Sequence, residues 1–278
     1  WVSVSHKLEA VSVVLPAFNA ETSILAAIQS TLRSLGEEDE LVIVEDGSTD
    51  RTWEIMQSIQ DDRITMTRNK TNLGIARSLN KGILLSKFET IARMDADDKC
   101  PPWRFQMQKR IFRDSSVDLL FGTQIYIRRH MPIPLVHTYV TRKSGQVLDS
   151  ALSIACILAH PTLFGKKSCL TDLGMYRDVV AEDYDLWIRA RLNGTTILRH
   201  WMPMNFYHWS SKSVSKLDAP KVKTSPTLLR LKNELFSRAN ADPSTVSCDS
   251  REKFLDGLIK KDPLLRAELG LFTHPFQK

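Results

Sequence analysis

The sequence has no apolar run long enough to cross a membrane. Its most apolar stretch, residues 151–159, is shorter than the roughly 18 residues that a span needs, and His160-Pro161 interrupts it. No signal peptide is visible, because the apolar run 11–15 leads straight into polar residues. The chain begins with Trp1 rather than Met, so we expect that it has been trimmed.

Cysteine is scarce, with four widely spaced residues and no C-x-x-C pair. Cys156 and His160 are close in sequence, but no second ligand pair accompanies them, which argues against a zinc site. Scattered thiols fit a reducing compartment, so we expect a cytoplasmic protein. The sequence also lacks internal repeats and low-complexity tracts. Its net charge of +6 is too mild to choose among nucleic acid, anionic lipid and phosphorylated substrates as partners.

Short apolar runs alternate with helical patterns over the first 122 residues. The sequence predicts strands at 11–15, 41–44, 64–67, 90–94 and 117–121. Helices are predicted at 24–35, about 51–60, 73–86 and from 101 onward. This order predicts an α/β fold whose mostly parallel sheet is flanked by helices and joined by right-handed crossovers.

The pattern becomes irregular after Gly122. We expect strands near 126–129, 195–200 and 205–209, a strand end that enters a turn at 160–164, and helices near 146–157 and 182–192. From about residue 226 the chain is predicted to be helical, at 228–239, 251–260 and 263–269. We therefore expect a lead-in (1–10), a main domain (11–220, with halves 11–122 and 123–220) and a C-terminal helical extension (221–278).

Three carboxylates, Asp95, Asp97 and Asp98, follow the predicted strand 90–94. Alternate side chains of a strand share a face, so we expect Asp95 and Asp97 to point the same way. Like charges this close are unfavourable unless a cation lies between them, and Mg²⁺ and Mn²⁺ prefer oxygen ligands. A solvated acidic turn is the alternative interpretation, because so short a motif also arises by chance.

Polar clusters at 19–21, 45–50 and 95–98 each follow a predicted strand. Ligands of parallel α/β sheets bind outside the carboxyl ends of the strands. We therefore expect the three clusters to form one site.

These residues resemble the pattern of glycosyltransferase family 2, whose members have the GT-A fold. Residues 11–21 resemble the family's opening strand and nucleotide-binding turn, 44–50 its second signature and 72–82 its third. Asp95-Ala96-Asp97-Asp98 matches the D-x-D motif, and Glu182-Asp183, before Tyr184-Asp185-Leu186-Trp187, resembles the E-D motif. The resemblance covers roughly 10–215, with all five motifs in the family's order.

The resemblance implies a metal-dependent, inverting transfer of a sugar from a nucleotide-diphosphate sugar, with a UDP-sugar expected. The acceptor would be a hydroxyl of a glycan or lipid-linked molecule in cell-surface polysaccharide biosynthesis, with no nucleic-acid partner. Asp183 would be the catalytic base, with Glu182 beside it, and Asp46 would contact the nucleotide base. Asp97 and Asp98 would bind Mn²⁺ or Mg²⁺. The expected nucleotide-binding residues are Pro16, Phe18, Asn19, Glu21, Asp46, Asn72, Arg77, Asp95 and Ala96.

Several assignments have structural alternatives. The first turn of a helix favours acids such as Glu182 and Asp183 in any case, and Arg77 fits a solvated helix face equally well. His160 either borders the acceptor or satisfies a buried hydrogen bond. We assign His160 and Asp185 to the acceptor site as expectations.

The chain departs from the family at the metal site. Many members carry Tyr-Arg-x-His, whose His can help to bind the metal, whereas this chain has Tyr207-His208-Trp209-Ser210. Either His208 takes over as a ligand or the third protein ligand is missing. We assign His208 to the metal site as an expectation.

A basic group follows this stretch, and it is either a solvated face or a peripheral contact with the inner face of a membrane. Its members are Lys212, Lys216, Lys221, Lys223, Arg230 and Lys232.

Two other classes of protein compete with a glycosyltransferase. Sugar nucleotidyltransferases share a similar sheet, but they usually carry a Gly-rich loop and a basic residue after the first strand, which 16–19 lacks. Pyrophosphate release would identify that activity. A non-catalytic sugar-binding module would show no turnover.

Overall fold

The computed structural model describes residues 8–127, 135–136, 145–208, 221–222 and 224–239. Within these residues, eight strands form one sheet in the order β3-β2-β1-β4-β7-β5-β6, with β8 paired to β5. The strands are β1 (Val11–Ala17), β2 (Glu40–Glu45), β3 (Ile64–Arg68), β4 (Thr90–Arg93), β5 (Leu119–Ile127), β6 (Leu135–Val136), β7 (Phe164–Lys166) and β8 (Ile197–His208).

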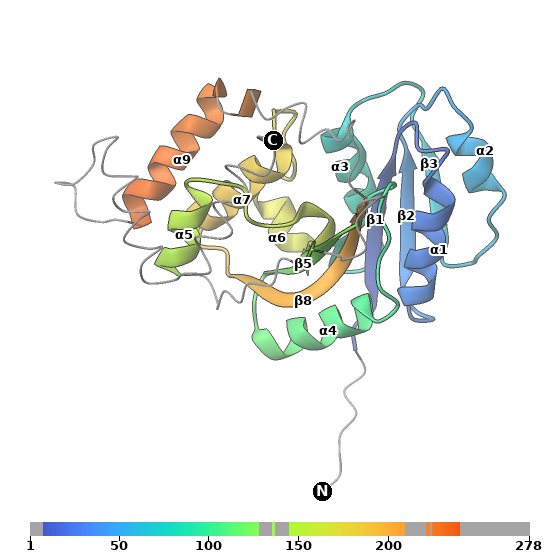
Figure 1. Cartoon of the computed structure of the whole chain (residues 1–278), viewed down its shortest axis with the longest axis horizontal. Coiled ribbons are helices and arrows are strands. Elements are labelled where there is room, and N and C mark those ends of the chain that lie inside the picture. The colour runs from blue at the N-terminus through green and yellow to red at the C-terminus, as the bar shows by residue number, and fades with distance from the viewer. Residues whose placement is uncertain (1–7, 128–134, 137–144, 209–220, 223, 240–278) are drawn as a thin grey trace, which may run out of the picture.

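Helices cover the sheet, as expected for an α/β fold. In Figure 1, α1 and α2 accompany β1–β3, whereas α5, α6, α7 and α9 gather at the other end of the molecule. The helices are α1 (Ile24–Ser34), α2 (Thr52–Gln57), α3 (Ile75–Leu85), α4 (Arg104–Ser115), α5 (Gln146–Leu152), α6 (Lys167–Asp172), α7 (Glu182–Leu192) and α9 (Pro226–Ala239), with a 3₁₀ turn η1 (His160–Thr162).

The first four strands confirm the sequence prediction, because β3, β2, β1 and β4 are mutually parallel. The second half differs from the expected arrangement. β7 is antiparallel to both β4 and β5. The two short strands expected at 195–200 and 205–209 are one long strand, β8, which runs parallel to β5 across two register shifts. The predicted strand at 126–129 is, as far as it is described, the end of β5.

In the described part of the chain, two apolar cores pack against the sheet. One contains Ile24, Ile28 and Phe105 and belongs mainly to the first half of the chain. The other is centred on Trp187 and includes Leu231 and Leu235 of α9. α9 packs against α5 and α7, so the described part of the C-terminal region lies on the main domain. The predicted helices at 251–260 and 263–269 lie outside the described residues, and the predicted domain boundaries stay predictions.

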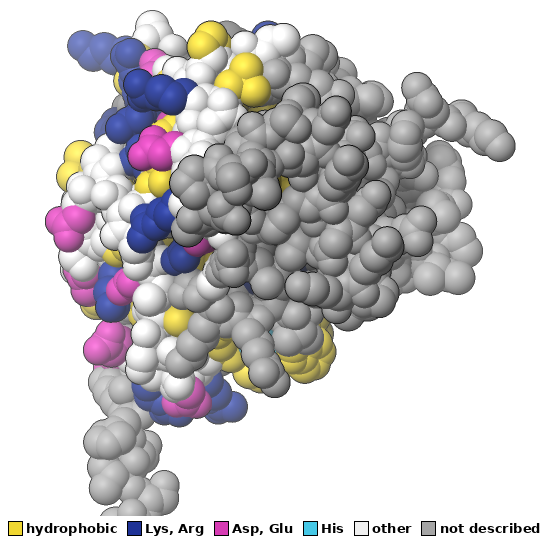
Figure 2. Space-filling model, turned by 90° about the vertical axis from the view of Figure 1, so that its left-hand side faces the viewer, with side chains coloured by type: hydrophobic (Ala, Val, Ile, Leu, Met, Phe, Trp, Pro, Cys, Tyr) yellow, Lys and Arg dark blue, Asp and Glu magenta, His cyan; other side chains and the backbone are white. Residues whose placement is uncertain are grey.

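Among the described residues, no helix combines the length and apolarity that a membrane span requires. Figure 2 shows Lys and Arg side chains interspersed with Asp and Glu over the described part of one face. Of the basic group predicted to contact a membrane, Lys212, Lys216 and Lys223 lie outside the described residues. Lys232 donates to the carbonyl of Ile154 (2.9 Å).

Gly82 lies where α3 packs against the sheet. An added Cβ would stand 2.4 Å from Val14 Cγ1 and 3.3 Å from Val44 Cγ2. We expect Gly82→Ala to lower the free energy of unfolding by about 1–3 kcal/mol through overpacking, despite the roughly 1 kcal/mol that Ala gains in helix propensity. Denaturant unfolding measures this, with Leu84→Ala at an exposed site of the same helix as the control. A Gly82→Ala protein as stable as the native one would contradict this packing.

Candidate active site

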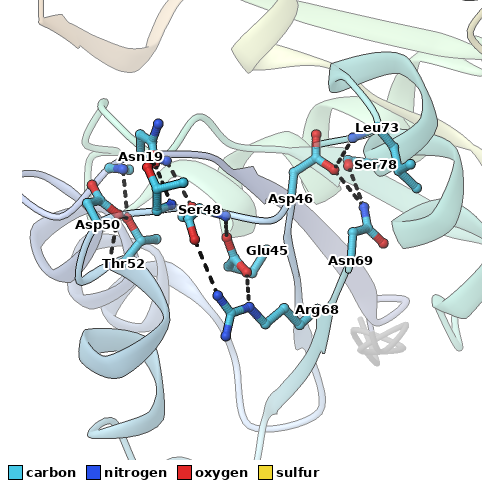
Figure 3. A network of polar contacts seen from close by, with 12 residues as sticks. Asn19, Glu45, Asp46, Ser48, Asp50, Thr52, Arg68, Asn69, Leu73 and Ser78 are labelled. Carbon is cyan, nitrogen blue, oxygen red and sulfur yellow. Dashed lines mark hydrogen bonds and ion pairs between the residues drawn. The ribbon is translucent and has the colours of Figure 1, made fainter. Parts of the chain in front are cut away.

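Asp46 lies directly after β2 and organises the loop that precedes α3. One of its oxygens accepts from Asn69 Nδ2 (2.7 Å) and from the backbone N–H of Leu73 (2.9 Å), and the other accepts from the N–H of Gly74 (2.9 Å). Figure 3 shows this carboxylate between β2, the end of β3 and the start of α3. Asp46 is almost fully buried. Its hydrogen bonds therefore hold in place the loop that borders the expected nucleotide site.

The loops after β1 and β2 hold each other through side chains of both signatures. Asn19 Oδ1 accepts from the N–H of Thr49 (3.0 Å), while Asn19 N–H donates to Ser48 Oγ (2.9 Å). Glu21 Oε2 accepts from the N–H of Arg51 (3.2 Å). Between them, Gly47 has φ 71°, and a Cβ there would meet the Thr71 backbone at 2.5 Å. Asn19 and Glu21 thus shape the loops themselves.

The remaining predicted nucleotide-binding residues differ in exposure. The Phe18 side chain is 45% exposed at the end of β1, where a ring is free to contact a ligand. Asn72 is exposed, and its Oδ1 accepts from the N–H of Gly74 (2.9 Å). Pro16 and Ala96 are half-buried. Arg77 is exposed and forms an ion pair with Asp178 (3.1 Å), which fits the solvated-face interpretation.

The three acids of the D-x-D motif lie together after β4. Asp95, Asp97 and Asp98 each offer an oxygen within 4.8 Å of the others. β4 ends at Arg93, so the acids lie in a turn, and the strand alternation that we invoked for Asp95 and Asp97 does not apply. Asp95 forms an ion pair with Arg93 (Nη2–Oδ1 2.5 Å). Desolvation, followed by the charge of Asp95, raises the pKa of Asp97 to about 6 although its side chain reaches solvent.

Asp98 is buried and connects this turn to β8. It accepts from Asn205 Nδ2 (2.5 Å) and from the backbone N–H of His208 (3.0 Å). Burial and the neighbouring carboxylates raise its pKa well above the usual range. His208 therefore contributes its main chain, and its ring is not part of the cluster formed by the three acids. A direct role of the His208 ring as a metal ligand stays a prediction.

The second acid group opens α7. Ala181 adopts the left-handed conformation (φ 54°), which is uncommon for a residue with a side chain, and Glu182 and Asp183 form the first turn after it. Asp183 Oδ1 accepts from the N–H of Tyr184 (2.7 Å), while Oδ2 lies 3.8 Å from His160 Nδ1 and 3.8 Å from Cys156 Sγ. Oδ2 of the expected base thus accepts from the Cys156 thiol and is surrounded by side chains of the second half.

Burial sets the protonation of these groups. Desolvation, and for Glu182 also the charge of Asp183, raises the pKa of Glu182 to about 7 and that of Asp183 above its usual range. Burial, followed by Arg93, holds the pKa of His160 well below its usual range, so the ring is neutral. Its Nε2 is 2.8 Å from Tyr176 Oη. Of our two interpretations of His160, the structure has the buried hydrogen bond.

The expectation that Asp185 contacts the acceptor is wrong. Its carboxylate is fully buried and pairs with Arg189 (2.7 Å) and, more distantly, with Arg177 (3.8 Å). Arg189 also donates to the carbonyls of Leu173 and Met175. Asp185 thus stabilises the segment before α7 through Arg189, and its side chain has no exposed surface that a ligand could contact.

Helix α3 also holds the segment before α7 in place. Asn80 Nδ2 donates to the carbonyl of Tyr176 (2.8 Å), and the Tyr176 N–H donates to Asn80 Oδ1 (3.0 Å). Since Tyr176 bonds His160, this pair connects the third signature to the surroundings of Asp183.

Glu182 is held where its charge is unfavourable, with its pKa raised from 4.5 to about 7. A raised carboxyl pKa makes ionisation costly in the folded state, so the cost is absent at low pH and complete above pH 7. We expect Glu182→Gln to raise the free energy of unfolding at pH 8 by about 1–3 kcal/mol and to change little near pH 4. Thermal unfolding at both pH values measures this, with exposed Glu37→Gln as the control. Equal effects at the two pH values would contradict the prediction.

Sequence reasoning missed Arg93 and Asn205 as parts of the site. A charged residue within an apolar strand was a signal for Arg93. Asn205 gave no signal, because it reaches the site only through its tertiary contact with Asp98.

Residues 12–139 match the model of glycosyl transferase family 2. The chain is 26% identical over 208 residues to the Escherichia coli UDP-Glc:alpha-D-GlcNAc-diphosphoundecaprenol beta-1,3-glucosyltransferase WfaP. The aligned region covers 75% of this chain and 80% of that protein. It is 28% identical over 191 residues to the putative glycosyltransferase EpsE of Bacillus subtilis, covering 64% of this chain and 66% of the relative.

Solved structures share the fold. S. aureus TarS 1–349 in complex with UDP-GlcNAc has a TM-score of 0.64 at 16% identity, covering 92% of this chain and 81% of TarS. The complex with UDP has a TM-score of 0.62 at 18% identity, covering 88% and 78%. The expected GT-A architecture is confirmed. Residues 12–139 thus match glycosyltransferase family 2, and this match together with the named relatives identifies the chain as a glycosyltransferase.

Proposed function

We propose that this glycosyltransferase moves a sugar from a UDP-sugar to a hydroxyl of a lipid-linked glycan, with inversion and with the help of a divalent cation. The observation that carries the proposal is a pair of acid groups, Asp95-Asp97-Asp98 after β4 and Glu182-Asp183 at the start of α7. One group suits a cation and a diphosphate, and the other suits proton removal.

The first acid group fits Mn²⁺ or Mg²⁺ because its donors are carboxylate oxygens within 4.8 Å of one another. Asp97 reaches solvent, whereas both oxygens of Asp98 already accept hydrogen bonds. We therefore propose Asp97 as the main ligand, with Asp98 and Asp95 supporting it. A bound cation would offset the negative charge that grows on the leaving diphosphate.

Asp183 is the proposed base. Its Oδ2 takes the proton of the acceptor hydroxyl while the hydroxyl oxygen bonds to the anomeric carbon, and the bond from that carbon to the diphosphate breaks. The raised pKa of Asp183 makes it a stronger base than an exposed carboxylate. The Tyr184 N–H holds Oδ1, so the other oxygen is oriented for this transfer.

The name of one relative supports the acceptor class that we propose. The name of the E. coli relative specifies a lipid-linked acceptor, a GlcNAc-diphosphoundecaprenol. We extend that class, and with it a role in polysaccharide biosynthesis, to this protein. Such an acceptor would bring the protein to the inner face of a membrane as a peripheral protein.

Calorimetric titration with UDP, with and without Mn²⁺, tests the donor half of the proposal. We expect Mn²⁺-dependent binding that is at least about tenfold weaker in Asp97→Asn, while Asp62→Asn at an exposed site keeps it. Turnover of a panel of UDP-sugars then identifies the donor. Absence of binding by native protein to UDP, GDP and dTDP would contradict the proposal.

A further inference from the structure

His160, Glu182 and Asp183 meet at the start of α7, although they come from two separate parts of the sequence. Each offers one donor atom, and these atoms lie within 4.8 Å of one another. We propose that they form a second cation site, distinct from the D-x-D cluster, which binds Zn²⁺ and thereby stops the transfer reaction. Binding of Zn²⁺ is independent of the proposed function, whereas its inhibitory effect rests on Asp183 being the base.

The imidazole of His160 is directed at both carboxylates through Nδ1. This atom lies 3.8 Å from Asp183 Oδ2 and 3.9 Å from Glu182 Oε1, which is too far for a hydrogen bond. Among the described residues Nδ1 has no hydrogen-bond partner, although the side chain is only 9% exposed. Two zinc bonds of about 2.0–2.2 Å can span such separations, so one cation fits between Nδ1 and the two oxygens.

The other ring nitrogen is held as in a metal-binding histidine. His160 Nε2 lies 2.8 Å from Tyr176 Oη, and the main chain of Tyr176 forms two hydrogen bonds with Asn80 (2.8 and 3.0 Å). Histidines that bind metals donate their second N–H to an oxygen, which orients the ring. With its proton on Nε2, His160 has this arrangement, and Nδ1 keeps the lone pair that binds a cation.

The two carboxylates lack a basic partner at contact distance. In the part of the chain that the structure describes, neither Glu182 nor Asp183 forms an ion pair with lysine or arginine, and their side chains are only 16% and 22% exposed. Neighbouring acids with so little access to water repel each other, so a cation between them is favoured. The exposed part of each side chain gives the cation access from solvent.

The donor atoms distinguish this site from the D-x-D cluster. That cluster offers carboxylate oxygens alone, which suit Mg²⁺ or Mn²⁺, whereas an imidazole nitrogen with two carboxylates suits Zn²⁺. Cys156 Sγ lies 3.8 Å from Asp183 Oδ2, and a thiol next to the site also favours the softer cation. Cys156 and His160 have no second ligand pair near them in the sequence, but the fold supplies one from α7.

Occupation of this site would disable the base. Asp183 Oδ2 is the oxygen that takes the proton of the acceptor hydroxyl in the proposed reaction, and a cation bound to it uses the same lone pair. The D-x-D cluster consists of other residues, so UDP should still bind with Mn²⁺. We therefore expect Zn²⁺ to lower kcat without displacing the donor nucleotide.

Calorimetric titration of the ligand-free protein with Zn²⁺, in excess Mg²⁺, tests the site without any substrate. We expect His160→Gln to weaken Zn²⁺ binding by about 100-fold or more, and Tyr176→Phe by about 10- to 100-fold, the usual effect of losing an outer hydrogen bond. His200→Gln is the matched control, because His200 belongs to no cluster of three donors among the described residues. Asp97→Asn should also keep the site. Native affinity in either of the first two variants, or loss of binding in Asp97→Asn, would overturn the inference.

Glu182→Gln decides if His160→Gln does not fold, because we expect Glu182→Gln to be more stable than native protein at pH 8. It removes a charged ligand while keeping the shape of the side chain. Its affinity for Zn²⁺ should be at least about tenfold weaker. A Glu182→Gln protein that binds Zn²⁺ as tightly as native protein would overturn the inference.

Activity gives the second readout. With the donor that native protein uses and with excess Mn²⁺, Zn²⁺ should inhibit turnover, and about 10- to 100-fold more Zn²⁺ should be needed in Tyr176→Phe. The affinity for UDP with Mn²⁺ should stay the same when Zn²⁺ is added. Inhibition that more Mn²⁺ relieves, or bound Zn²⁺ without inhibition, would overturn the inference. Native protein that turns over no UDP-sugar would instead refute the proposed function, and the Zn²⁺ titration would still test the site.

Discussion

Asp183→Asn is expected to lower kcat by about 10²- to 10⁴-fold while leaving the affinity for UDP in the presence of Mn²⁺ unchanged. The amide keeps the shape of the side chain but cannot take the proton of the acceptor hydroxyl. Its oxygen can still accept from the Tyr184 N–H (2.7 Å in the native protein), so the local structure should survive. Steady-state turnover and UDP calorimetry on the same preparation measure the two effects.

Two controls make this result specific to the base. Asp172→Asn alters an exposed acid of the same half of the chain and should leave kcat as in native protein. Glu182→Gln separates the two members of the pair, because Glu182 is expected to be protonated for part of the neutral range. If Glu182→Gln lost about 10²- to 10⁴-fold in kcat while Asp183→Asn retained turnover, the base would have to be reassigned to Glu182.

Asp185→Ala should lower the free energy of unfolding by about 3–5 kcal/mol, the range for breaking a buried ion pair from one side. The carboxylate is fully buried against Arg189, and its loss would leave that guanidinium without its charge partner. Because Arg189 also bonds two carbonyls of the segment before α7, this segment should loosen as well. Denaturant unfolding measures the loss.

The comparison is Asp178→Ala, which breaks the exposed ion pair with Arg77 and should cost at most about 1 kcal/mol. An Asp185→Ala protein as stable as Asp178→Ala would contradict the structural role. If it also bound acceptor poorly, the acceptor assignment that the buried ion pair overturned would have to be reconsidered.

The first half of the fold was predictable because its signals are local. β1 and β2 are buried on both faces and read as continuous apolar runs, and the repeat of apolar residues marks α1 and α3. β7 was not predictable as an antiparallel strand, since three residues, Phe164–Lys166, carry no directional signal. β8 appeared as two strands because Pro203 and the register shifts opposite Thr123 interrupt its pattern.

The site was predictable where chemistry lies in short motifs. The three acids after β4 do gather, although they do so through a turn. We misassigned Asp185 because it lies close to the expected base in the sequence. Arg189, four residues later on the same helix, already indicated an ion pair with Asp185. Asn205 acts through a long-range contact with Asp98, which one sequence without homologues does not reveal.

The contacts of Asp98 bear on how this enzyme could be recombined with its relatives. The family match ends at residue 139, yet the partners of Asp98 are Asn205 and the main chain of His208, and Lys99 and Phe206 bridge beside them. A chimera that joined residues 8–127 to a foreign second half would keep the whole D-x-D motif. It would lose the hydrogen bonds that hold the last carboxylate of the motif, Asp98. Such hybrids should therefore carry their own equivalent of β8, with an amide side chain at the Asn205 position, if donor specificity is to be transplanted intact.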